Sequence, residues 1–131
     1  MSVDAIGNFL TIIRNGLMAS KSIVTAPYSR MKAELARVLI EEGFIKDAQI
    51  ITDDTGKKHI KILLKYVDGE SVIHEIKRIS TPGRRIYRSI DNVKPVIGGL
   101  GISILTTSAG LMTHKQAKQR GIGGEIICSV W

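Results

Sequence analysis

The stretch TTSAG places the hydroxyls of Thr106, Thr107 and Ser108 in a row just before Ala109 and Gly110. Such side chains could supply a nucleophile, hold a phosphate, or form hydrogen bonds with a larger polar partner. The acyl-transfer pattern G-x-S-x-G would need glycine at position 106, where threonine stands. Because the sequence also marks out no histidine or acid as a base for Ser108, an enzyme is not predicted.

Glycine-rich stretches could instead cradle a phosphate or a nucleotide cofactor. The stretch GGLG at 98–101 lacks the spacing of a G-x-x-x-x-G-K-[ST] loop, and GIGG at 121–124 precedes a strand pattern rather than a helix. Turn and close-packing roles are therefore predicted, and no cofactor is expected. The scattered histidines give no metal site, and Cys128 lies in an apolar run, which favours a buried thiol over a reactive one.

The positive charge of the chain is concentrated in its last part. Residues 1–76 contain ten Lys and Arg against ten Asp and Glu, whereas residues 77–131 contain nine against two. This asymmetry indicates a polyanionic partner, although a merely solvated basic face is the alternative. A membrane surface is not favoured, because neither a basic amphipathic helix nor a lipid signal is present. The basic residues concerned are Lys77, Arg78, Arg84, Arg85, Arg88, Lys94, Lys115, Lys118 and Arg120.

Hydroxyl side chains within a basic segment are suited to RNA. They donate and accept, and so can bond base edges, 2′-hydroxyls and phosphates. Tyr87 lies among arginines and could stack on an unpaired base; the alternative is a strand residue that packs its ring inward.

Two helices are predicted in the first part of the chain. Val3, Ile6, Leu10, Ile13 and Leu17 follow three- and four-residue steps, with Asp4 suited to the positive end of the helix. Ser29 is the expected N-cap of a second helix, and Gly43 its stop signal.

Strand patterns accompany these helices. The short run SIVTAP lies between them, and the runs at 44–52 and 57–66 are joined by DDTG as a hairpin. In the second run, apolar residues alternate with lysines, which predicts one buried face. The alternating positions are Ile60, Lys61, Ile62, Leu64, Lys65 and Tyr66.

The last part should be mainly strands with one short helix on its surface. Residues 72–79 read as a strand or connector, Thr113 and Gln116 have capping-box spacing, and Gly121 would end the helix. We expect an α+β fold of two small α/β-type domains: a helix-strand-helix-hairpin domain over 1–75 and a basic, strand-rich domain over 76–131.

Several long motifs occur in a specific order: IIRNG, APYSRMKAELARVLIEEGFI, STPGRRIY, GGLGISILTTSAGLMT and GIGGEIIC. Together they closely resemble the ribosomal protein S8 family of the small subunit, of bacterial or organellar type, over nearly the whole chain. The resemblance implies two α/β-type domains, binding to the central domain of small-subunit rRNA during assembly, neighbouring ribosomal proteins as partners, and no catalysis. A ribosome-bound protein of the cytoplasm, or of an organelle's stroma or matrix, is expected, with no export signal, no membrane and no small-molecule substrate.

The resemblance also implies which residues contact RNA. The stretch TTSAG at 106–110, here called the hydroxyl loop, would read an irregular RNA helix, with Tyr87 and Glu125 beside it. Thr106 stands where the family's loop has serine. Glu125 would accept from a base amino group, or be an ordinary strand-edge acid. The resemblance implies further RNA contacts in the first domain, which is touched near the starts of its two helices. The alternative role of Ser29 is that of a helix cap, and the alternative for Arg14 is a surface charge. The full predicted set is Thr106, Thr107, Ser108, Gly110, Tyr87, Glu125, Arg84, Arg85, Arg88, Lys115, Lys118, Arg120, Arg14, Asn15, Pro27, Ser29 and Lys32.

Two other functions stay open at this point. A translational repressor would bind structured messenger RNA, such as that of its own operon, through the same surface. A small hydrolase would depend on Ser108 and act without RNA.

Overall fold

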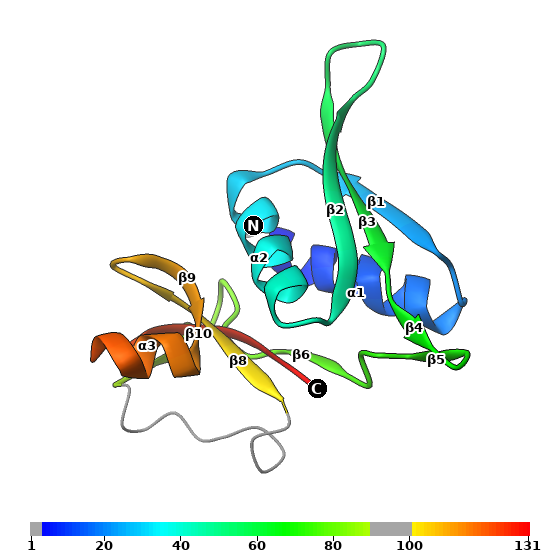
Figure 1. Cartoon of the computed structure of the whole chain (residues 1–131). Helices are drawn as coiled ribbons and strands as arrows, with labels where there is room; N and C mark the ends of the chain where they lie inside the picture. Colours follow the sequence, from blue (N-terminus) through cyan, green and yellow to red (C-terminus); the bar gives the residue numbers. More distant parts are fainter. Residues whose placement is uncertain (1–3, 90–100) are drawn as a thin grey trace. The chain divides into compact units, whose positions relative to one another are not determined.

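Figure 1 shows the computed structural model of the chain, which describes residues 4–89 and 101–131. The chain divides into two compact units. Residues 8–73 form one, here called the N-terminal unit, and residues 74–131 together with the described residues 4–7 form the other, called the C-terminal unit. Helices and antiparallel sheets confirm the expected α+β class. The boundaries expected for two domains, 1–75 and 76–131, stay a prediction.

The N-terminal unit has the predicted order of helix, strand, helix and hairpin. Its three-stranded antiparallel sheet has the order β1-β3-β2, and the hairpin of β2 and β3 is the long projecting ribbon of Figure 1. The elements, in chain order, are α1 (Ala5–Met18), β1 (Ile23–Pro27), α2 (Arg30–Glu41), β2 (Ile45–Thr52), β3 (Lys58–Leu64), β4 (Tyr66–Val67) and β5 (Glu70–Ser71). The first residues of α1, up to residue 7, are counted with the C-terminal unit.

Local signals explain these elements. The apolar stripe of α1 is buried at Ile6, Leu10 and Ile13, while Val3 lies outside the described residues. Ser29 caps α2, because its hydroxyl accepts a hydrogen bond from the Lys32 N–H at 3.2 Å. In β3 the alternate apolar residues Ile60, Ile62 and Leu64 are buried, as the alternation predicts.

One strand boundary differs from the expectation. Tyr66 does not continue β3, which ends at Leu64; it belongs to β4, a short strand paired with β5. The Tyr66 hydroxyl donates to the Lys21 carbonyl at 2.6 Å. Tyr66 therefore does not follow the alternating pattern of β3; its hydroxyl has a hydrogen-bond partner outside that strand.

The C-terminal unit is built around the central strand β10. Strands β6 and β7 pair with β10 at different points, β8 pairs with it as well, and β9 lies beyond β8. Its core contains Ile104, Leu105 and Ile127, each 0% exposed. The elements are β6 (Ile76–Arg78), β7 (Tyr87–Arg88), β8 (Ile102–Thr107), β9 (Gly110–Thr113), α3 (His114–Arg120) and β10 (Gly124–Val130).

The short helix α3 has the predicted ends. Thr113 and Gln116 form a capping box, and Gly121 closes the helix in the left-handed conformation with φ 67°. Ala117 turns inward and is 0% exposed, whereas the polar residues around it are exposed. No helix in the described ranges is long and apolar enough to cross a membrane.

Candidate nucleic-acid interface

The hydroxyl loop is the tight turn between β8 and β9. Thr107 pairs with Gly110, so Ser108 and Ala109 form the exposed tip. The Thr107 hydroxyl accepts from the Ala109 N–H at 3.1 Å and donates to the Gly110 carbonyl at 2.8 Å. Gly110 has φ 103°, a conformation that side chains rarely adopt. The turn is thus held from within by Thr107, while the Ser108 hydroxyl faces solvent.

A row of three side chains crosses the sheet beside this turn. Glu125 on β10 lies opposite Tyr87 on β7 and opposite Thr106 on β8. Residues directly opposite each other in antiparallel strands project from the same face of the sheet. The structure therefore brings Glu125 next to Thr106 of the hydroxyl loop, and Tyr87 next to Glu125.

Gly124 permits the close approach of β10 to this loop. A Cβ at position 124 would collide with the Thr106 carbonyl oxygen, and it would lie 3.2 Å from the Thr107 Cγ2 methyl. Gly124, the last glycine of GIGG, therefore has the close-packing role that the sequence predicts, rather than that of a phosphate cradle.

Tyr87 is exposed. Its relative accessibility is 64%, which excludes the alternative that the ring packs inward. An exposed tyrosine ring offers a flat face to an unpaired base.

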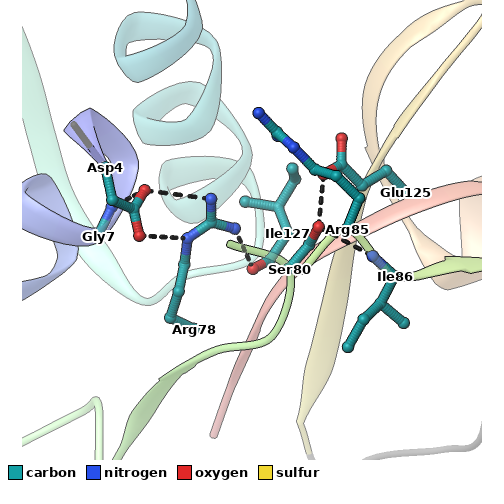
Figure 2. Close-up of polar contacts among 8 residues, drawn as sticks. All are labelled: Asp4, Gly7, Arg78, Ser80, Arg85, Ile86, Glu125 and Ile127. Carbon is teal, nitrogen blue, oxygen red and sulfur yellow. Dashed lines mark hydrogen bonds and ion pairs between the residues drawn. The ribbon is translucent and has the colours of Figure 1, made fainter. Parts of the chain in front are cut away.

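Glu125 is the buried acid of this row. It is 7% exposed, and its Oε2 accepts from the Ser80 hydroxyl at 2.5 Å and from Arg85 at 3.0 Å (Figure 2). Burial raises the pKa of Glu125, but the hydrogen bonds from Ser80 and Arg85 and the charges of Arg85 and Arg78 outweigh it, so the net pKa is below the ordinary value. Because β10 is central, the alternative of a strand-edge acid is wrong.

A second ion pair shows that Arg78 does not belong to an outward basic surface. Arg78 binds both carboxylate oxygens of Asp4, at 3.2 and 3.3 Å, and the Ile127 carbonyl at 2.8 Å (Figure 2). Asp4 also accepts from the Gly7 N–H at 2.9 Å, as a residue suited to a helix N-terminus does. Burial raises the pKa of Asp4, but these bonds and the charges of Arg78 and Arg85 outweigh that effect, so the net pKa is below the ordinary value.

Most of the other predicted cations of the C-terminal unit face solvent. Arg85 differs, because its guanidinium is committed to Glu125 although its side chain is 49% exposed. Lys94 and residues 98–100 lie outside the described ranges. In residues 4–89 and 101–131 the following exposed cations have no ion pair: Lys77, Arg84, Arg88, Lys115, Lys118 and Arg120.

The predicted residues of the N-terminal unit lie on α1 and at the start of α2. Arg14 and Asn15 are exposed on α1, and Pro27 is exposed at the end of β1. Lys32 is only 8% exposed, and its ammonium donates to the Pro27 carbonyl at 3.1 Å. Pro27, Ser29 and Lys32 thus lie together at the start of α2, where Ser29 acts as the cap.

The described residues show neither a metal cluster nor a reactive thiol. No group of three histidine, cysteine or acidic residues is arranged to hold an ion in that part of the chain. Cys128 is 0% exposed, and burial raises the pKa of its thiol to about 12. The thiolate required of a nucleophile is therefore suppressed.

The sequence patterns missed Ser80. This residue lies between β6 and the turn of STPGRR, is 0% exposed, and contacts Glu125. A lone serine between a strand and a turn gives no periodic signal, and its partner is 45 residues away along the chain.

Known proteins resemble this chain over its whole length. A family model described as ribosomal protein S8 matches residues 4–131. The small ribosomal subunit protein uS8 of Thermodesulfovibrio yellowstonii is 50% identical over 134 residues, covering 100% of both chains. That of Halothermothrix orenii is 50% identical over 98% of this chain and 97% of its own. That of Pseudomonas aeruginosa is 46% identical over the same shares of the two chains.

Proposed function

Since the chain belongs to the ribosomal protein S8 family, we propose that it is a structural, non-enzymatic constituent of the small ribosomal subunit. It binds the central domain of small-subunit rRNA and supports its assembly. The observation that carries the proposal is the row of Tyr87, Glu125 and Thr106 beside the exposed Ser108 turn.

The chemistry of this row supports base recognition. Both hydrogen bonds that the described residues make to the Glu125 carboxylate go to Oε2, so Oε1 remains to accept from a base amino group. The exposed Tyr87 ring can stack on an unpaired base, and Ser108 can donate and accept at once. Such groups discriminate between sequences, whereas phosphate contacts mainly position the protein.

The exposed cations supply the nonspecific part of the affinity. Arg84 and Arg88 flank the row in sequence, and Lys115, Lys118 and Arg120 lie on α3. Cations of this kind release condensed counterions from a nucleic acid, so their contribution weakens with salt. Arg85 differs from them, because it acts mainly through Glu125.

The N-terminal unit contributes a second contact. Arg14 and Asn15 on α1, together with Pro27, Ser29 and Lys32 at the start of α2, are the residues that we assign to it. The N-terminus of α2 attracts an anion through its free N–H groups and its dipole. A phosphate of the RNA backbone suits such a contact better than a base edge.

The same surface could serve other partners. A messenger RNA leader that folds like the rRNA site would compete for it, and this competition is how a translational repressor would act. Neighbouring proteins of the small subunit are further partners.

The test compares two RNAs across a salt series. A fragment of the small-subunit rRNA central domain and a generic duplex of equal length are titrated with the protein. We expect a preference of about a thousandfold or more for the fragment that persists as salt rises, since base and shape readout depend less on salt than phosphate contacts do. Equal affinities that fall together would contradict the proposal.

A further inference from the structure

One buried hydroxyl connects the acid and the aromatic residue of the proposed RNA site. Ser80 is 0% exposed, and its Oγ donates to Glu125 Oε2 at 2.5 Å. The same Oγ accepts from the Ile86 N–H at 3.1 Å (Figure 2). A serine has one proton to donate, so this hydroxyl is committed to the carboxylate while its lone pair holds the backbone.

The first bond fixes the orientation of Glu125. Ser80 and Arg85 both donate to Oε2, which leaves Oε1 as the oxygen that can accept from a ligand. Without the Ser80 proton, the carboxylate would keep only the bond from Arg85, whose side chain is 49% exposed. A single bond from a long exposed side chain leaves a carboxylate free to rotate.

The second bond fixes the strand that carries Tyr87. Ile86 is held at both backbone groups: its N–H donates to Ser80, and its carbonyl accepts from the Ile126 N–H at 2.9 Å. Tyr87 follows directly and pairs with Glu125 in β7. Because Tyr87 is itself exposed, its position depends on this anchoring of the backbone rather than on packing of its ring.

From these contacts we infer that Ser80 is a positioning residue for RNA recognition, which sets the Glu125 carboxylate and the Tyr87 strand relative to each other. The inference rests on the proposed function. Ser80 itself is buried and touches no ligand, so it acts only through its two neighbours.

The variant Ser80→Ala removes both bonds while keeping most of the volume of the side chain. We expect it to lose about tenfold or more of the preference for the rRNA fragment over the duplex, because two recognition groups become mobile at once. Affinity for the generic duplex should stay nearly unchanged, since the exposed cations are untouched.

Ser103→Ala is the matched control. Ser103 is also a buried serine of the same unit, 4% exposed, and its hydroxyl lies 3.3 Å from that of Ser129. It resembles Ser80 in burial and in bonding but pairs with Ser129, away from Glu125. Loss of preference in both variants alike would overturn the inference, because any destabilised serine variant would then behave in the same way.

The pH dependence of binding gives a readout that a purely structural serine would not move. Without the Ser80 hydroxyl, the Glu125 carboxylate loses a hydrogen-bond donor that stabilises its charged form, so the pKa of Glu125 should rise. The neighbouring charges stay the same: those of Arg85 and Arg78, and that of Asp4, which pairs with Arg78. The loss of RNA affinity on acidification should therefore begin at a higher pH in Ser80→Ala than in Ser103→Ala. An unchanged pH profile would overturn the inference.

Amide hydrogen exchange tests whether the Ser80→Ala variant is folded. We expect Ser80→Ala to lose protection at Ile86 while the core strand β8 stays protected. Retained RNA preference despite an unprotected Ile86 would overturn the positioning role and leave the proposed function intact. If the wild-type protein itself shows no preference, the proposed function and the inference fail together.

A second substitution tests the same role in case Ser80→Ala does not fold. Ser80→Cys keeps a side chain of similar shape with a much weaker donor. It should fold and show the same loss of preference. If both variants unfold, the hydroxyl is required for the fold itself, and the assignment of a positioning role is wrong.

Discussion

At the scale of single residues, neighbouring hydroxyls in the loop have different roles. Thr107 uses its hydroxyl within the turn, donating to Gly110 and accepting from Ala109. Ser108 is exposed at the tip, and in residues 4–89 and 101–131 its hydroxyl makes no hydrogen bond. The sequence cannot separate the two, because both are short hydroxyl residues in one run. Only the backbone of the turn decides which one faces solvent.

This difference leads to a prediction for Ser108→Ala. The variant should lose about 1 to 3 kcal/mol of binding free energy for the rRNA fragment, because a base-edge hydrogen bond disappears. Affinity for the generic duplex should stay the same, as should the free energy of unfolding, since the side chain is exposed. Both affinities can be measured by filter binding or fluorescence anisotropy.

Ala109→Gly is a suitable control, since it changes the other residue of the same tip without touching a hydroxyl. Equal losses on both RNAs would argue against a specific role of Ser108.

At the scale of elements, local signals predicted most of what positions the site. Helix caps at Ser29 and Thr113, the stop at Gly121 and the alternation in β3 all act within a few residues, so they can be read from sequence. The pairing of β7 with β10 could not be read in this way. It joins residues about 37 positions apart, and the buried Ser80 that contacts Glu125 beside it has no periodic pattern.

Helix α3 presents a test of the electrostatic part of binding. Lys118→Ala should flatten the plot of log affinity against log salt by up to about 1 unit, because one phosphate contact and its released counterions are lost. This decrease in slope should be the same for the rRNA fragment and for the duplex. A titration at several salt concentrations measures the slope.

Gln119→Ala, an exposed neutral neighbour on α3, should leave the slope unchanged. If Lys118→Ala gave the same slope as Gln119→Ala, Lys118 would be a solvated charge and not an RNA contact.

At the scale of the whole molecule, the excess of positive charge was predictable but its internal arrangement was not. The last 55 residues carry nine cations and two acids, and this balance predicts a basic C-terminal part. Within that part Arg78 is committed to Asp4 and Arg85 to Glu125, so two of the cations neutralise buried or half-buried acids instead. Asp4 comes from the opposite end of the chain, which composition alone cannot reveal.

These buried acids should make the C-terminal unit sensitive to acid. The folded-state pKa of Glu125 lies below its ordinary value of 4.5, because the bonds from Ser80 and Arg85 and the neighbouring arginines outweigh the effect of burial. Between the two values the unfolded chain binds more protons than the folded one. Stability is therefore fully present above about pH 4.5 and falls as the pH drops below it, by at most about 1.4 kcal/mol per pH unit for one proton.

Urea unfolding followed by the fluorescence of Trp131, the only tryptophan and a residue of the C-terminal unit, measures this dependence. Glu125→Gln should be less stable than the wild type at pH 7, because Arg85 loses its charged partner, and the difference should shrink as the pH falls from 5 toward 3. Glu75→Gln, which changes an exposed acid of the same unit, should run parallel to the wild type. A constant difference between Glu125→Gln and the wild type at every pH would mean that the Glu125 carboxylate does not stabilise the fold through its charge.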